Sequence, residues 1–410
     1  MNIAFILNSF PVLSETFIVN QIVALMDRGV DVEILAASSG GGGKSHALVR
    51  DRGLIDRTIY AQPEPGAGRV SWKRAGAATL RGLCQRPLPS LRAWLPTTMG
   101  TAGLRPGIIQ RMKGFPSPGR YDAIHAHFAT AGVVAEFARR CGFLKGPLIT
   151  TFHGIDVNET PTPAQARRYR ELFRSGDRFT ANTNFTASQA EKLGCPREKV
   201  DILPVGLDPK RYAFQPRLMR GGERLELLSV ARLVEKKGLE YGIRAVAKLR
   251  TKGVSVRYRI AGDGVLRSEL ERLINELGAE ACVELLGWCD QDEVARLYEE
   301  SHVFMLPSVT ASNGDREGQG LVLQEAQAMG LPVISTLHNG IPEGVIDGET
   351  GLLVPEKDAD ALAGAIERLL KDNDRWPEIG RKGRELVEQH YDQRVLAEKL
   401  IKIYERVQSA

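Results

Sequence analysis

Two glutamates eight positions apart, Glu317 and Glu325, are the residues whose type and spacing first suggest chemistry. The apolar run Val303–Leu306 predicts a buried strand before them, and the pattern of Leu321–Met329 predicts a helix. Glu317 would then lie at the carboxyl end of a strand, where open α/β sheets bind ligands, beside a helix N-terminus that attracts phosphate. An isolated pair with this spacing is usually a coincidence. With the strand, glycines and helix around it, it could hold a nucleotide sugar, one carboxylate near the sugar and one near the ribose.

Two cations, Arg232 and Lys237, follow the predicted strand Leu225–Val230. An arginine presents a planar fork and a lysine a compact charge, and both suit a diphosphate. Lys236 is an alternative to Lys237 for the second position. The structural alternative is a pair of solvated cations ahead of a helix.

His153 follows the predicted strand Pro147–Phe152 and precedes a glycine. A lone histidine is more often structural, but the end of a strand favours a role in a site. His125 and His127 lie on the predicted strand Ala123–His127 with their side chains on one face. They could line a site or belong to the core.

The elements that must position these residues come in two series. Strands and helices alternate from Asn2 to Leu203 and again from Leu225 onward, with a basic, glycine-containing linker, 209–223, between them. This order predicts two doubly wound α/β domains. A chain of 410 residues is long enough for two cores.

The composition is that of an ordinary globular protein, with 43% hydrophobic and 26% charged residues. No apolar run approaches the ~20 residues that span a bilayer, and the N-terminus lacks the features of a signal peptide. The five cysteines form no CxxC pair, so neither a disulfide framework nor a zinc site is indicated. We therefore expect a cytoplasmic protein.

Positive charge is concentrated between Lys44 and Arg120, where 14 Lys and Arg face 3 Asp and Glu in a chain of net charge +5. Such a segment can bind anionic lipid or pyrophosphate groups, which would place the protein at the inner face of the membrane. No nucleic-acid motif accompanies it, so we expect no nucleic-acid partner. The alternative is a solvated basic surface.

Five segments follow one another at characteristic spacing. They are Pro204-Val-Gly-Leu-Asp208, Ser229 to Gly238, Ile260-Ala-Gly-Asp-Gly264, Gly314 to Glu325, and Gly340 to Glu343 with the turn Asp347 to Leu353. Together they resemble the retaining glycosyltransferases of family 4, the glycosyl transferases group 1. The opening Phe10-Pro-Val-Leu-Ser-Glu-Thr-Phe-Ile18 further resembles the branch that builds exopolysaccharides such as colanic acid.

The resemblance implies a GT-B fold, with two Rossmann-like domains facing a deep cleft. Residues 1–207 would form the acceptor-binding domain, with the basic insert at about 44–120. Residues 208–390 would form the donor-binding domain, and the C-terminal helix, 391–410, would pack back on the first domain.

The resemblance also assigns roles in the donor site. Glu317 would contact the transferred sugar, Glu325 the ribose hydroxyls, and Arg232 with Lys237 the diphosphate. The remaining donor residues are the backbone amides of Gly318, Gly320 and Leu321 at the helix start, and Trp288 beside the base. Gln319 stands where many members carry an apolar residue, a departure that bears on the geometry of these amides.

In the first domain, the resemblance places His153 near the donor sugar as a catalytic residue, and Glu15 and Thr16 at the acceptor. Helix capping is the alternative for the latter two. The implied reaction moves a hexose from a nucleoside diphosphate sugar to a glycan or lipid-pyrophosphate-linked acceptor with retention, without metal or other cofactor. Alternatives are a nucleotide-sugar 2-epimerase of the same fold and a non-catalytic sugar-nucleotide-binding protein.

Overall fold

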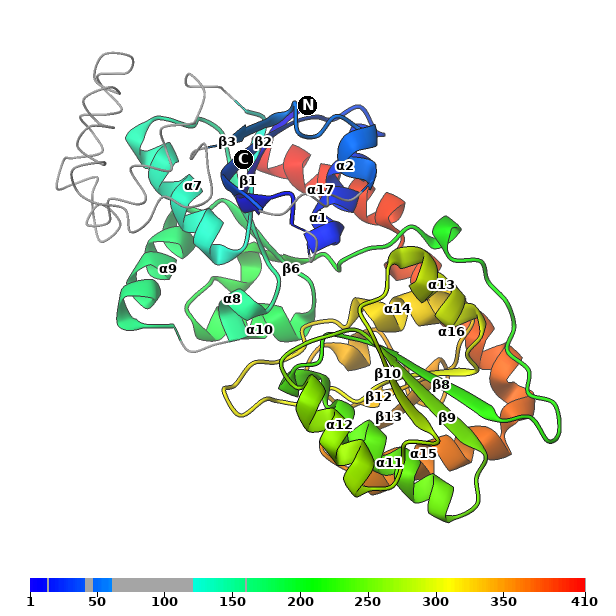
Figure 1. The fold of residues 1–410 in the computed structure, drawn as a ribbon. Coiled ribbons are helices and arrows are strands. Elements are labelled where there is room, and N and C mark those ends of the chain that lie inside the picture. The colour runs from blue at the N-terminus through cyan, green and yellow to red at the C-terminus, as the bar shows by residue number, and fades with distance from the viewer. Residues whose placement is uncertain (13–14, 41–46, 61–120, 159–160, 410) are drawn as a thin grey trace. The chain divides into compact units, whose positions relative to one another are not determined.

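The computed structural model describes residues 1–12, 15–40, 47–60, 121–158 and 161–409. They form two compact units, 1–203 with 396–410, and 204–395 (Figure 1). Most of the predicted basic segment 44–120 lies outside the described residues. Within the described ranges, no helix is both long and apolar enough to cross a bilayer.

The first unit is built on a seven-stranded parallel sheet with the order β3-β2-β1-β4-β5-β6-β7. Its strands are β1 (Asn2–Phe10), β2 (Asp31–Ser39), β3 (Thr58–Tyr60), β4 (Ala123–His127), β5 (Leu148–Phe152), β6 (Arg178–Ala181) and β7 (Val200–Ile202). Its helices are α1 (Thr16–Met26), α2 (Ala47–Asp51), α7 (Ala129–Cys141), α8 (Ile155–Asn158), α9 (Pro163–Ser175), α10 (Asn184–Lys192) and α17 (Gln393–Gln408).

The second unit has a six-stranded parallel sheet with the order β10-β9-β8-β11-β12-β13. Its strands are β8 (Leu225–Val230), β9 (Val256–Ala261), β10 (Val283–Gly287), β11 (Val303–Leu306), β12 (Val333–Thr336) and β13 (Gly351–Val354). Its helices are α11 (Leu239–Thr251), α12 (Arg267–Glu276), α13 (Gln291–Glu299), α14 (Leu321–Ala328), α15 (Ala359–Lys371) and α16 (Trp376–His390). Figure 1 shows α11, α12 and α15 on one side of this sheet and α13, α14 and α16 on the other.

Both sheets reverse their strand order at one point. In the first unit the reversal lies between β1 and β4, and in the second between β8 and β11. Such a switch point opens a crevice at the carboxyl ends of the two strands, where ligands of doubly wound sheets bind. The two parallel sheets confirm the predicted pair of Rossmann-like domains.

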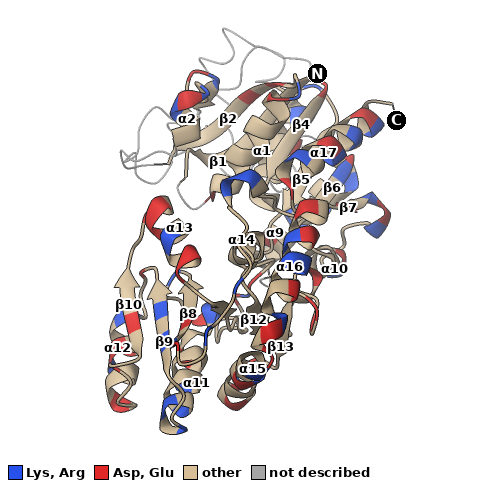
Figure 2. Cartoon of the chain, turned by 90° about the vertical axis from the view of Figure 1, so that its right-hand side faces the viewer, with Lys and Arg blue, Asp and Glu red and all other residues tan. Residues whose placement is uncertain are grey.

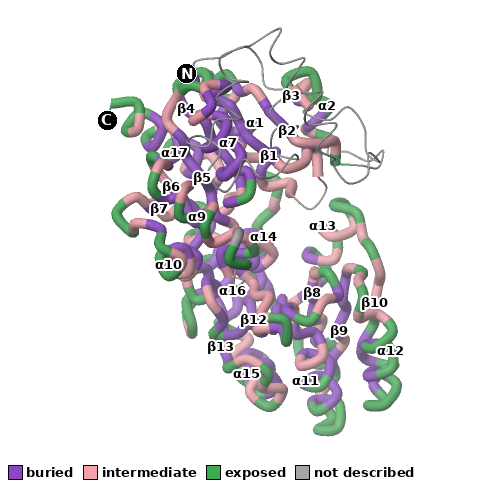
Figure 3. The backbone as a smooth tube through the Cα atoms, turned by 90° about the vertical axis from the view of Figure 1, so that its left-hand side faces the viewer, coloured by how far each residue is buried: buried purple, intermediate pink, exposed green. Residues whose placement is uncertain are grey.

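Most residues of the strands in each sheet are buried. Figure 3 shows β1, β4 and β5 largely buried and the outer side of α12 exposed. Charges of both signs alternate along α16 (Figure 2), where Arg381 pairs with Glu385 and Arg384 with Glu388 one turn on. The strands and the inward-facing residues of the helices supply the cores.

The C-terminal helix α17 packs into the core of the first unit. Leu396, Leu400 and Tyr404 are buried in the same cluster as the apolar residues of β1 and α1. The chain therefore crosses from the first unit to the second at Leu203–Pro204 and returns at Val395–Leu396.

Helix α9 and strand β13 are among the elements that were not predicted from the sequence. Helix α9 begins with a capping box in which Thr162 and Gln165 satisfy each other's backbone N–H groups, with a proline in its first turn. Strand β13 overlaps the stretch Asp347–Leu353, which was predicted to be a turn. In the structure, Gly351–Val354 pairs in parallel with β12. The apolar residues of β13 complete the edge of the second sheet.

Candidate active site

The loops after β8 and β11 meet at the switch point of the second unit. Lys237 Nζ forms an ion pair with Glu317 Oε2, and neither side chain is more than 14% exposed. Beside this pair, Lys236 Nζ lies 3.1 Å from Asp315 Oδ1. Lys237, the residue predicted from the sequence, therefore contacts the first glutamate, whereas Lys236 holds the loop that precedes it.

A glycine allows the two loops to approach closely. Gly238 has a φ of +60°, and a Cβ there would lie 1.9 Å from the carbonyl oxygen of Pro307. Only glycine fits without moving the backbone, because the obstacle is another main chain and the conformation is left-handed. The contact between the β8 and β11 loops thus depends on this position.

The charge of Glu317 is fixed by its surroundings. Burial acts to raise the pKa of its carboxyl, but the ammonium groups of Lys237 and Lys236 outweigh burial, and the net shift is downward. Glu317 is therefore a carboxylate at neutral pH. A negative group held against a cation can accept hydrogen bonds from sugar hydroxyls.

Arg232 differs from the two lysines. It is exposed, and its side chain forms no hydrogen bond or ion pair with the described residues, although its carbonyl accepts the N–H of Val234. It lies in the loop that follows β8, at the same edge of the sheet as Lys237. An unpaired guanidinium there is available for an anionic ligand.

His338 and Glu356, which sequence reasoning missed, support the backbone of Glu317. The imidazole of His338 is fully buried, and its Nε2 accepts the N–H of Glu317 at 3.1 Å. Its Nδ1 therefore carries the proton and donates to Glu356 Oε1 at 2.6 Å. Glu356 also accepts the N–H of Thr310 at 2.7 Å, so one carboxylate ties the β11 loop to the imidazole. The only signal in the sequence was the position of His338 two residues before the Gly340 turn.

The helix start after Glu317 has the predicted form. Gly320 is the N-cap of α14 with a φ of 77°, and Leu321 is its first residue, while Gly318 is buried in the same loop. The side chain of Gln319 turns away and binds the backbone of Val205, accepting its N–H at 2.8 Å and donating to its carbonyl at 2.9 Å. The residue that departs from the family pattern thus anchors the loop.

The two remaining donor residues lie in different environments. Glu325 is partly buried on α14 and accepts a hydrogen bond from the hydroxyl of Tyr298 at 3.1 Å; burial raises the pKa of its carboxyl. Trp288 directly follows β10, and its side chain is 65% exposed. The structure therefore brings Glu317 and Lys237 into contact and leaves Trp288 on the surface of the same unit.

His153 lies at the carboxyl end of β5 in the first unit. Its Nε2 is 2.9 Å from Nδ1 of His127, and the two rings stack with centroids 5.2 Å apart. Burial lowers the pKa of His153 to about 3, so the ring is neutral at pH 7. Its Nδ1 is buried without a hydrogen-bond partner among the described residues.

His125 belongs to the core and not to a site. Its ring nitrogens lie 2.6 Å from the hydroxyl of Tyr404 on α17 and 2.6 Å from that of Thr151. Burial, with a smaller contribution from His153, lowers the pKa of His125 to about 3. This histidine links β4 and β5 to the C-terminal helix.

Glu15 and Thr16 lie at the start of α1, at the switch point of the first unit. Glu15 is the N-cap residue but makes no side-chain capping bond, and Thr16 is the first residue of the helix. Capping therefore does not account for the side chain of Glu15. The predicted site residues form two groups, one in each unit.

Two family models match the chain. The model described as Glycosyltransferase Family 4 matches residues 14–211, and the model described as Glycosyl transferases group 1 matches residues 213–404. Each model covers most of one of the two units.

Curated relatives match over nearly their whole length. The chain is 38% identical to a protein of Escherichia coli strain K12 that is named as a colanic acid biosynthesis glycosyltransferase, WcaL, with 98% of each chain covered. It is 33% identical to the amylovoran biosynthesis glycosyltransferase AmsK of Erwinia amylovora, over 99% of this chain and 100% of the relative.

Solved structures share the fold at lower identity. HepE from Anabaena in complex with UDP superposes with a TM-score of 0.72 at 19% identity, covering 99% of this chain and 100% of its own. A glycosyltransferase from Rickettsia africae superposes with a TM-score of 0.71 at 18% identity, covering 99% and 98%.

Proposed function

Because the chain belongs to the glycosyl transferases group 1, we propose that it moves a hexose from a nucleoside diphosphate sugar to a saccharide acceptor with retention of configuration. The observation that carries this proposal is the ion pair between Lys237 and Glu317 at the switch point of the second unit, beside the unpaired Arg232. Such a donor has a diphosphate, which is a polyanion, and a sugar, which is a polyol. Arg232 and Lys237 offer cations for the diphosphate, and Glu317 offers a carboxylate for the sugar hydroxyls.

In this proposal, Arg232, Lys237 and the amides of Gly318 to Leu321 bind the diphosphate. Glu317 accepts hydrogen bonds from the hexose, Glu325 from the ribose, and Trp288 lies beside the base. HepE, which shares the fold, was crystallised with UDP-glucose, which supports a nucleotide sugar as donor.

The chemistry needs the leaving diphosphate to be stabilised as negative charge develops on it. The bond between the anomeric carbon and the phosphate oxygen breaks, and the acceptor oxygen bonds to the same carbon from the same face. The acceptor's proton passes to the departing phosphate oxygen. The cations of this unit can carry out the stabilisation, so we propose a reaction without a metal ion. His153 is proposed to contact the hexose from the first unit as a neutral ring.

The names of the relatives support a place in exopolysaccharide biosynthesis. We propose that the acceptor is a growing glycan, carried on a lipid pyrophosphate at the inner face of the membrane. The basic segment 44–120 would attract the anionic surface. Flotation with anionic and with neutral vesicles tests this step, and equal binding to both would contradict it.

A panel of UDP-, GDP- and ADP-sugars tests the donor proposal. Thermal shift should single out one nucleotide, because a ligand that binds the native state raises its apparent stability. Nuclear magnetic resonance of the reaction with that donor should show an α-linked product from an α-linked sugar. Conversion of the donor to an isomer without acceptor would identify a 2-epimerase, and binding without any turnover a non-catalytic protein.

A further inference from the structure

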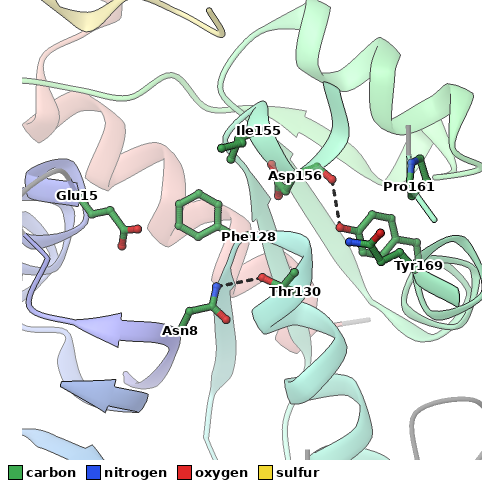
Figure 4. A pocket seen from close by; sticks show the side chains of 9 residues that line it. Asn8, Glu15, Phe128, Thr130, Ile155, Asp156, Pro161 and Tyr169 are labelled. Carbon is green, nitrogen blue, oxygen red and sulfur yellow. Dashed lines mark hydrogen bonds between the residues drawn. The ribbon is translucent and has the colours of Figure 1, made fainter. Parts of the chain in front are cut away.

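A pocket of about 280 Å³ opens at the switch point of the first unit. It lies at the carboxyl ends of β1 and β4, the place where doubly wound sheets bind ligands. Asn8 near the end of β1, Glu15 before α1, Phe128 and Thr130 after β4, and Tyr169 on α9 line it (Figure 4). Elements far apart in the sequence thus converge on one small cavity.

The side chains of this pocket suit hydroxyl groups. The carboxylate of Glu15 has no hydrogen-bond partner among the described residues, and burial raises its pKa. The amide of Asn8 donates to Thr130 Oγ1 at 3.0 Å, which leaves its carbonyl oxygen as an acceptor. A sugar hydroxyl can donate to the carboxylate and to the amide oxygen, and can accept from the threonine hydroxyl.

Phe128 contributes an apolar ring to the pocket, and its backbone conformation is strained. Its φ of 73° and ψ of 144° lie in a region that residues other than glycine rarely adopt. Such a conformation is energetically costly, and residues held in it cluster at functional sites. The ring contacts His153, with centroids 4.8 Å apart, so its position is tied to the histidine proposed for the hexose.

The charges of the pocket argue against phosphate. Its described lining includes the acids Glu15 and Asp156 and neither lysine nor arginine. Asp156 is committed to structure, because its oxygens accept the N–H groups of Ala129 at 2.8 Å and His153 at 3.1 Å. A phosphate here would be repelled by two carboxyl groups, with no counter-charge in the described lining. An uncharged sugar would experience no such repulsion.

We propose that this pocket binds one uncharged monosaccharide unit of the acceptor and excludes its phosphate groups. The volume lies just below the range of about 300–1,000 Å³ for small-molecule sites, which fits a single sugar ring. The inference rests on the proposed function, since it concerns that reaction's acceptor. A lipid pyrophosphate would then have to bind outside the pocket, with at least this sugar unit between it and the growing end.

Saturation-transfer NMR on the full chain tests the proposal. The probes are methyl glycosides of glucose, galactose, mannose and fucose, and the corresponding sugar 1-phosphates. All proteins carry Glu317→Gln, so that binding of a free sugar in the donor site is weakened. We expect at least one methyl glycoside to receive saturation, and its 1-phosphate to receive at least tenfold less.

Two variants and a matched control locate the binding. Glu15→Gln and Asn8→Ala should each reduce saturation of the glycoside at least fivefold, whereas Glu191→Gln, an exposed carboxylate of the same unit, should leave it unchanged. Circular dichroism confirms that each variant is folded. Equal saturation in Glu15→Gln, or stronger binding of the 1-phosphate, would overturn the inference.

The outcome separates this inference from the proposed function. Binding of UDP-, GDP- and ADP-sugars by the unmutated chain reports on the proposed donor site, to which neither Asn8 nor Glu15 is assigned. If a nucleotide sugar binds and is consumed while the pocket variants bind glycosides normally, only the inference fails. If no nucleotide sugar binds, the proposed function fails, whatever the pocket does.

Discussion

The switch points of the two units occupy equivalent places in the same topology but carry different chemistry. In the second unit, Lys237 and Lys236 lower the pKa of the buried Glu317 and keep it charged. In the first unit no opposite charge among the described residues offsets burial at either group, so burial raises the pKa of Glu15 and lowers the pKa of His153 to about 3. One site is built from paired charges and the other from groups that burial drives toward neutrality.

This difference shows that the sheet specifies where a ligand binds and the loops specify which ligand. A donor with a diphosphate needs cations whose charge is held in place. An acceptor with hydroxyl groups needs hydrogen-bonding groups that do not repel it. The two halves of a transfer reaction can therefore share one architecture without sharing a site.

The largest expected effect comes from removing a charge at the second switch point. Lys237→Met should reduce kcat for transfer by about 10²–10³, because it removes a group that stabilises the developing charge of the diphosphate. Steady-state kinetics with the donor identified by thermal shift measure the change. Lys252→Met, at an exposed ion pair with Glu367, is the matched control and should retain full activity. A Lys237→Met enzyme with normal kcat would show that the charge of Lys237 does not contribute to transfer, and would contradict the proposed role of the second switch point.

The histidines of the first unit should make its stability depend on pH. An unfolded histidine titrates near pH 6.5, whereas the pKa of buried His125 is about 3. Below pH 6.5 the folded state binds fewer protons than the unfolded state, so the free energy of unfolding falls as pH falls. For this residue the loss is about 2 kcal/mol between about pH 6.5 and pH 5.

Hydrogen exchange of β4 and β5 measures this effect in the first unit alone. His125→Gln should lose less protection than the unmutated chain over that pH interval. Burial raises the pKa of Asp156 to about 6, so its protonation increases the free energy of unfolding as pH falls. This effect is the same in both proteins and does not alter their difference. Identical pH dependence of the two proteins would show that His125 does not carry the acid sensitivity.

The sequence predicted those parts of the structure that short, local patterns define. Strands β8 and β11 have the predicted bounds, because each is a largely apolar run between turn residues. Lys237 and Glu317 were each predicted to follow a strand and to belong to one donor site, and the structure brings them into contact. His338 and Glu356 were missed because their role arises only where the β12 loop folds against the β11 loop. The pocket beside Glu15 was missed because residues from several elements far apart in the sequence form it.

Glu356 offers a smaller test of how firmly the charged site is held. Its carboxylate fixes His338 with the proton on Nδ1, which leaves Nε2 free to accept the N–H of Glu317. In Glu356→Gln the side-chain amide can donate to Nδ1 of His338. The imidazole proton then lies on Nε2, where it faces the N–H of Glu317. We expect kcat to fall about tenfold, or about 1.4 kcal/mol in the barrier. Glu349→Gln, an exposed carboxylate of the same unit, should match the unmutated enzyme.

Gln319 should affect stability more than catalysis. Its amide satisfies both backbone groups of Val205, beside the crossover at Pro204, and the side chain is only 4% exposed. Gln319→Leu leaves these two groups without their partner and should destabilise the second unit by about 1–2 kcal/mol, which corresponds to a fall in Tm of about 2–8 °C. Gln319→Glu should be less stable still, because it buries a charge and cannot donate to the Val205 carbonyl. Donor affinity should change less than threefold in Gln319→Leu, since the side chain points away from the amides that face the diphosphate. A large loss of donor affinity at unchanged Tm would instead assign Gln319 to the binding site, and the charged switch point would then include the residue that ties the β11 loop to Val205.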